Sequence, residues 1–179
     1  MGYPFFYWPS CLMHNDGDGT FRDVAANVGI EPPADGRFLR ERIGHLMAAR
    51  SSRCAAVADF DGDGRLDLMV GNFNDRPFYF KNQFPQRHFI TFRLRGTKSN
   101  RDAIGAVVKL VIDDRVIVRQ VHATGGYLLQ SSKTLHFGLG DDARIDRAEI
   151  RWPSGTVQLL ELPAADRLHQ ITEPGVAAK

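Results

Sequence analysis

The chain has 179 residues, of which 43% are hydrophobic and 25% charged, as in an ordinary globular protein of one domain or two small ones. A formal net charge of +2 with no dense basic block argues against nucleic-acid binding, and no stretch reaches the ~18 uninterrupted apolar residues of a membrane span. The two cysteines, Cys11 and Cys54, lack metal-ligand spacing, which leaves open whether they are bridged or free.

The amino-terminal part begins with an apolar, aromatic segment and continues into a Gly-Asp-Gly unit. The start, MGYPFFYWPSCLM, contains two prolines and no basic segment, so no signal peptide is visible in it. In the unit that follows, HNDGDGTFRDV, we interpret residues 15–19 as a tight hairpin turn. A metal site is disfavoured there because His14 and Arg22 stand at the positions where the ligand template needs carboxylates.

The next element is a predicted helix. The segment RFLRERIGHLMAAR, residues 37–50, places five residues on one stripe at helical spacing: Leu39, Ile43, Leu46, Met47 and Arg50. We expect a short amphipathic helix whose stripe packs on the sheets; binding of a partner is the alternative.

From Ala56 onward the chain indicates a mostly β protein. Short apolar segments bounded by turn residues are typical of sandwiches, barrels and propellers. We expect these strands in chain order: CAAVADF, LDLMVGN, PFYFKN, HFITFRLRG, AVVKLVI, VIVRQVHA, YLLQSS, TLHFGL, RAEIRWP, TVQLLEL and LHQITE.

One loop between two of these strands, DFDGDGRLD, carries four aspartates: Asp59, Asp61 and Asp63 at every second position, and then Asp67. An EF-hand would need a bidentate Glu at its twelfth position, where this chain has Val70, and helices in place of the β-like flanks. The template D-x-D-G-D-G-x-x-D between strands fits, with the Arg65 backbone carbonyl as a further ligand. Such an all-oxygen set suits Ca²⁺ better than zinc, because Ca²⁺ is a hard cation. The alternative is a solvated Asp/Gly hairpin turn.

No motif for catalysis is recognisable, so we expect a protein that is not an enzyme. The chain lacks a G-x-S-x-G elbow, an H-E-x-x-H helix and a P-loop. Tyr127 and Trp152 could pack in the core or stack on a ligand, and core packing is favoured because large aromatics are mostly buried. The segment TKSNRDAIG, with Lys98, Arg101 and Asp102, is either a polar recognition loop or a turn; we favour the turn.

Five segments of the sequence resemble two known families. HNDGDGTFRDVAANVGI and VADFDGDGRLDLMVGNFNDRPFYFKN resemble the FG-GAP/VCBS-type β-propeller repeat, whose DxDGDGxxD loop binds calcium. RGTKSNRDAIGAVVKLV, GGYLLQSSKTLHFGLGD and IDRAEIRWPSGTVQLLEL are similar to the ASPIC/UnbV domain, which follows such repeats in secreted and cell-surface proteins. The resemblance implies that Ca²⁺ is bound by Asp59, Asp61, Asp63, Asp67 and the Arg65 carbonyl.

The expected architecture is a partial β-propeller-type repeat with a short helical insertion over residues 1–85, an antiparallel β-sandwich-like domain over residues 86–174, and a tail over residues 175–179. The chain holds about one and a half blades where propellers use four to eight, so further blades are expected in a longer parent chain.

The expected function is that of a noncatalytic calcium-binding adhesion or binding module, extracellular or periplasmic, whose partner is an extracellular protein or a glycan. The alternative is an accessory module of a carbohydrate-active or natural-product biosynthesis enzyme system.

Overall fold

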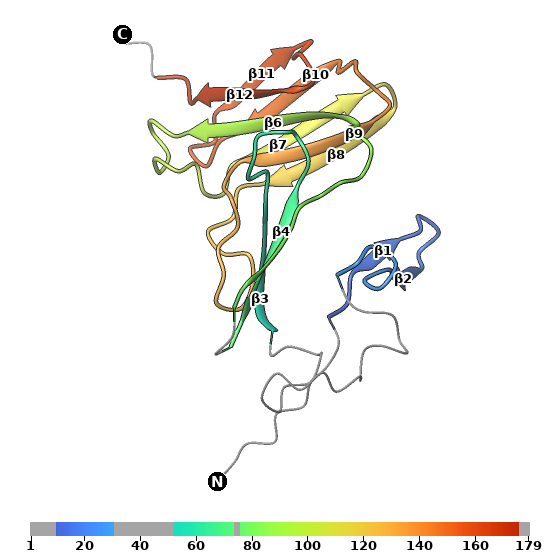
Figure 1. Cartoon of the computed structure of the whole chain (residues 1–179). Helices are drawn as coiled ribbons and strands as arrows, with labels where there is room; N and C mark the ends of the chain where they lie inside the picture. Colours follow the sequence, from blue (N-terminus) through green and yellow to red (C-terminus); the bar gives the residue numbers. More distant parts are fainter. Residues whose placement is uncertain (1–9, 31–51, 74–75, 176–179) are drawn as a thin grey trace, which may run out of the picture. The chain divides into compact units, whose positions relative to one another are not determined.

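The computed structural model describes residues 10–30, 52–73 and 76–175 (Figure 1). All the secondary-structure elements in these ranges are β-strands, so the prediction of a mostly β protein is confirmed. Contacts divide the chain into two compact units, residues 1–55 with 68–81 and residues 56–67 with 82–179. The helix predicted over residues 37–50 lies outside the described residues.

An antiparallel hairpin forms from β1 (Met13–Asn15) and β2 (Phe21–Asp23). The amide of Asp16 donates to the carbonyl of Thr20 at 3.1 Å and closes the turn between the strands. The predicted hairpin turn at residues 15–19 is therefore confirmed.

A second, three-stranded sheet has the order β3–β4–β5, with β3 at Ser52–Ala58, β4 at Asp67–Asn72 and β5 at Phe78–Phe80. Burial alternates along β3, as expected when one face of a strand is covered. The loop between β3 and β4 is the aspartate loop. This sheet has three strands, whereas a propeller blade has four, so the propeller-type repeat stays a prediction.

The second unit contains two further sheets that form a sandwich-like pair (Figure 1). The three-stranded sheet has the order β12–β6–β9, and the four-stranded sheet has the order β11–β10–β7–β8. Their bounds are β6 His88–Arg95, β7 Val107–Ile112, β8 Arg115–Gln120, β9 Leu135–Gly140, β10 Arg147–Arg151, β11 Val157–Glu161 and β12 Arg167–Thr172.

The hydrophobic core lies between these two sheets. Along β6, Ile90, Phe92 and Leu94 are buried while Arg93 and Arg95 are exposed, because successive side chains of a strand point to opposite faces. The other main core side chains come from both sheets and from the segments that follow β9 and β10: Val108, Leu110, Phe137, Leu139, Ile145, Ile150 and Trp152. The predicted sandwich-like fold is therefore confirmed for this part of the chain.

One strand pairing differs from the antiparallel prediction. β12 pairs with β6 in parallel, with Gln170 opposite Arg93. All the strands from β7 to β11 lie between β6 and β12 in the sequence, so no short hairpin imposes an antiparallel direction on this pair. The prediction was wrong here because hydrophobic alternation carries no information about strand direction.

One predicted strand is absent. The segment YLLQSS, residues 127–132, makes only an isolated bridge between Gly126 and Leu129. Leu128 has a φ of 53° and is 74% exposed, and neither is compatible with a paired strand on a covered sheet face. The domain boundary predicted at residues 85 and 86 stays a prediction, while the second compact unit also includes residues 56–67.

Candidate metal centre

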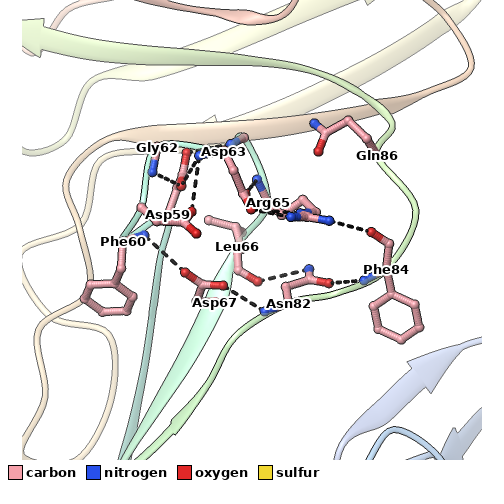
Figure 2. Close-up of polar contacts among 12 residues, drawn as sticks. Asp59, Phe60, Gly62, Asp63, Arg65, Leu66, Asp67, Asn82, Phe84 and Gln86 are labelled. Carbon is pink, nitrogen blue, oxygen red and sulfur yellow. Dashed lines mark hydrogen bonds and ion pairs between the residues drawn. The ribbon is translucent and has the colours of Figure 1, made fainter.

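The aspartate loop closes around Asp59 (Figure 2). Its Oδ1 accepts from the amides of Gly62 at 2.8 Å and Asp63 at 3.1 Å, and its Oδ2 accepts from the amide of Gly64 at 2.9 Å. Gly62 and Gly64 have φ values of 77° and 87°, a region that residues with a Cβ avoid. The glycines at these positions therefore allow the loop to turn its amides onto one carboxylate.

Three of the four aspartates form a cluster. Oxygens of Asp59, Asp61 and Asp63 all lie within 4.8 Å of one another. Asp61 Oδ1 accepts from the Asp63 amide at 3.3 Å, and Asp63 Oδ1 accepts from the Arg65 amide at 2.9 Å. Three carboxylates at this separation repel one another, and a cation between them would relieve that repulsion.

Arg65 supplies a positive charge to this cluster through its side chain. Its guanidinium hydrogen-bonds to Asp63 through both Nε, at 3.0 Å, and one terminal nitrogen, and it donates to the carbonyl of Phe84 at 2.9 Å (Figure 2). The hydrogen bond to Asp63 raises the pKa of the guanidinium. The sequence indicated a role only for the Arg65 carbonyl and did not indicate this partial compensation by the side chain.

Asp67 is not part of the cluster. It is 1% exposed, and its carboxylate accepts from the amides of Phe60 at 3.3 Å and Asn82 at 2.8 Å (Figure 2). The Asn82 side chain in turn donates to the carbonyl of Leu66 at 3.1 Å. Asp67 and Asn82 thus tie together the two ends of the loop and the segment after β5, a role that the sequence did not indicate for Asn82.

The loop packs against the β12–β6–β9 sheet at Gly64. A Cβ built on Gly64 would lie 2.1 Å from Cε1 of Phe89, so the ring occupies the space that any side chain would need. Phe89 stacks on His136 with 5.7 Å between ring centroids, and His136 Nε2 lies 2.7 Å from the Gly64 carbonyl. Because a carbonyl only accepts, Nε2 carries the proton and donates to it.

The other candidate residues lie in different environments. Trp152 is 1% exposed and donates to Gln158 Oε1 at 3.1 Å, so core packing is confirmed for it. Tyr127 is 71% exposed, and core packing is therefore wrong for it. In the described part of the chain, no disulfide joins Cys11 and Cys54.

One buried acid was missed from the sequence. Glu173 is 1% exposed, and its Oε2 accepts from the successive amides of Thr97, Lys98 and Ser99 at 2.8–2.9 Å. Its Oε1 accepts from the hydroxyls of Ser99 at 2.9 Å and Ser154 at 2.5 Å. Burial alone would raise the pKa of this carboxyl, but these hydrogen bonds outweigh it and lower the pKa to about 2. The carboxylate therefore joins three separate segments of the sandwich.

Comparison with known proteins identifies part of the chain. Residues 96–178 match the ASPIC and UnbV family. The chain is 38% identical over 66 residues to cartilage acidic protein 1 of Homo sapiens and 30% identical over 94 residues to the protein of that name in Xenopus tropicalis.

These alignments cover 37% and 52% of this chain but only 8% and 11% of the relatives. The chain thus spans about a tenth of the length of these relatives. The predicted ASPIC/UnbV part is supported, and the FG-GAP/VCBS part stays a prediction.

Proposed function

We propose that the loop from Asp59 to Asp67 binds Ca²⁺ and that the chain acts as a noncatalytic adhesion or binding module, extracellular or periplasmic. The observation that carries the proposal is the cluster of Asp59, Asp61 and Asp63 within one short loop. Similarity to proteins named for cartilage, a tissue rich in extracellular material, supports the location.

The donor chemistry of the cluster fits calcium. All the clustered donors are carboxylate oxygens, which suit a hard cation, and Ca²⁺ accepts six to eight oxygen ligands in flexible geometry. The three clustered carboxylates are too few for that number. We therefore propose three further ligands: the Arg65 carbonyl, the Asp67 carboxylate and water. To bind the ion, Asp67 would give up its hydrogen bond with the amide of Phe60 or Asn82.

The proposed role of the ion is structural. Bound Ca²⁺ carries two charges and would neutralise the cluster more completely than the single charge of the Arg65 guanidinium, which forms an ion pair with Asp63. The loop contacts the sandwich through Gly64, Phe89 and His136, so fixing the loop also fixes this contact. Free calcium at a hundredfold excess over its Kd would stabilise the folded state by about 2.7 kcal/mol through mass action.

The test is thermal unfolding of the chain and of Asp61→Asn in excess Ca²⁺, excess Mg²⁺ and chelator. Asp61 is exposed, so its substitution removes a ligand without opening the core. We expect Ca²⁺ to raise the Tm of the native chain more than Mg²⁺ does, because Mg²⁺ demands a tighter octahedral shell.

The control is Asp113→Asn, the same chemical change at an exposed turn outside the loop. It should keep the full response to calcium, whereas Asp61→Asn should lose it. If millimolar calcium leaves the Tm of the native chain unchanged, the loop is a solvated Asp/Gly hairpin turn and not a calcium site.

A further inference from the structure

A cleft lies on the outer face of the β12–β6–β9 sheet. Its volume is ≈ 740 Å³, within the ~300–1,000 Å³ typical of ligand pockets. Arg93 and Arg95 line it from β6, and Gln170 and Thr172 line it from the neighbouring β12, in register with them. All its lining residues belong to the second compact unit.

The cleft continues into a neighbouring one. A second cleft of ≈ 650 Å³ shares Arg93, Ser132 and Thr134 with the first and adds Arg119 and Arg167. Because the two clefts share lining residues, they form one elongated depression across the sheet face. Such a shape suits a chain of several units better than a single small ion.

The charge of the cleft is positive. Arg93, Arg95 and Arg101 are exposed, and within the described part of the chain none of them has an ion-pair partner within 4.0 Å. The acid in the first cleft, Asp102, is paired with Lys133 at 2.5 Å, which lowers the pKa of Asp102. The second cleft contains two acids, Asp59 and Asp166, and Asp166 is paired with His88. Arginines outnumber acids along the two clefts together, so the charge of their lining is net positive.

The rest of the lining is rich in neutral hydrogen-bonding groups. Hydroxyls and amides come from the segment before β9 and from β12: Gln130, Ser131, Ser132, Thr134, Gln170 and Thr172. Phe60, 50% exposed, adds an aromatic face. A ligand that fits this lining carries both anionic groups and many hydroxyls.

We propose that this elongated cleft binds an anionic oligosaccharide that bears sulfate or carboxylate groups on successive sugars. Arg93 and Arg95 stand two residues apart on one strand, so their Cα atoms are separated by about 6.6 Å and can contact two anionic groups of one chain. The planar guanidinium binds such oxoanions in bidentate fashion. The inference rests on the binding role proposed above. It does not require a bound calcium ion, but Asp59 and Gly62 of the aspartate loop line the second cleft.

An acidic peptide fits the cleft less well. An extended peptide gains affinity mainly by pairing its backbone with an exposed sheet edge, but this cleft lies on a sheet face, where the backbone groups already pair with β12 and β9. The hydroxyl-rich ligand is therefore favoured.

The experiment is isothermal titration calorimetry of the full chain with a heparin-derived sulfated hexasaccharide. The comparison ligands are the desulfated hexasaccharide, a polyglutamate peptide and inorganic sulfate. The test variant is R93Q/R95Q, and the matched control is R147Q/R151Q, which removes two exposed arginines from β10. We expect the sulfated hexasaccharide to bind at least about tenfold more weakly to R93Q/R95Q, because charge-assisted contacts are lost, and unchanged to the control.

Three outcomes would overturn the proposal: no binding of the sulfated hexasaccharide, equal weakening in both variants, or tighter binding of polyglutamate or inorganic sulfate. Equal weakening would show attraction by net charge alone, and tight polyglutamate binding would show a peptide site. Repeating the titration in chelator separates the two proposals. If the chain shows no affinity for calcium but still binds the sulfated hexasaccharide, only the calcium proposal is contradicted.

Discussion

The Glu173→Gln substitution tests whether the buried carboxylate stabilises the sandwich. In the native chain hydrogen bonds hold its pKa at about 2, below its usual 4.5. Each pKa unit corresponds to about 1.4 kcal/mol, so the ionised form contributes about 3 kcal/mol at neutral pH. An amide has no charge to strengthen the hydrogen bonds from Thr97, Lys98 and Ser99, so most of this stabilisation should be lost.

The sign of the pH dependence follows from the lowered pKa. The contribution of Glu173 is fully present above its usual pKa of 4.5 and is lost as the pH falls towards the folded-state pKa of about 2. The gap in stability between the native chain and Glu173→Gln should therefore be about 2–3 kcal/mol at pH 7 and should narrow steadily below about pH 4.5.

The assay is urea unfolding of both proteins over a pH series, with Glu161→Gln as the control because Glu161 is exposed on β11. The control should change the free energy of unfolding by less than about 0.5 kcal/mol. If Glu173→Gln changes the free energy of unfolding by less than about 1 kcal/mol, or by an amount that does not vary with pH, the ionised carboxylate does not stabilise the sandwich as proposed.

Two pairs of substitutions test the packing by urea unfolding at neutral pH. Gly64→Ala should lower the free energy of unfolding by more than about 2 kcal/mol, because the new Cβ would overlap the Phe89 ring. Gly62 has a similar φ but nothing within 4 Å of its Cβ position, so Gly62→Ala should lower the free energy of unfolding by only about 1–2 kcal/mol. Equal losses in the two variants would contradict the packing of the loop on Phe89. Phe92 is fully buried, so Phe92→Ala should lower the free energy of unfolding by about 3–5 kcal/mol. Phe84 is 60% exposed, and Phe84→Ala should lower it much less. A small effect of Phe92→Ala would contradict the placement of this ring in the core.

The strands and the hairpins could be predicted from the sequence because they depend on local patterns. Alternating residues such as Phe92 and Arg93 predict one covered and one open face, and the structure follows this pattern. The same pattern failed at Leu128, where a positive φ after two glycines interrupts the strand, although the side chains alone look suitable.

The candidate site could be predicted only in part, for the same reason. The spacing of Asp59, Asp61 and Asp63 shows directly in the sequence, and the loop brings them together. By contrast, Glu173 contacts amides 74 to 76 residues away, and His136 contacts the carbonyl of Gly64 72 residues away. Such partners are determined by the arrangement of the sheets, and no local pattern indicates them.

Direct calcium titration tests whether the clustered aspartates bind Ca²⁺. The chelator-treated chain should bind one Ca²⁺ by isothermal titration calorimetry, with a Kd as weak as about 10⁻⁴ to 10⁻³ M, as in extracellular calcium modules. Asp61→Asn should bind at least about tenfold more weakly, and Asp113→Asn should match the native chain. Absence of calcium binding by the native chain, or equal binding by the native chain and Asp61→Asn, would contradict the claim that the clustered aspartates hold the ion.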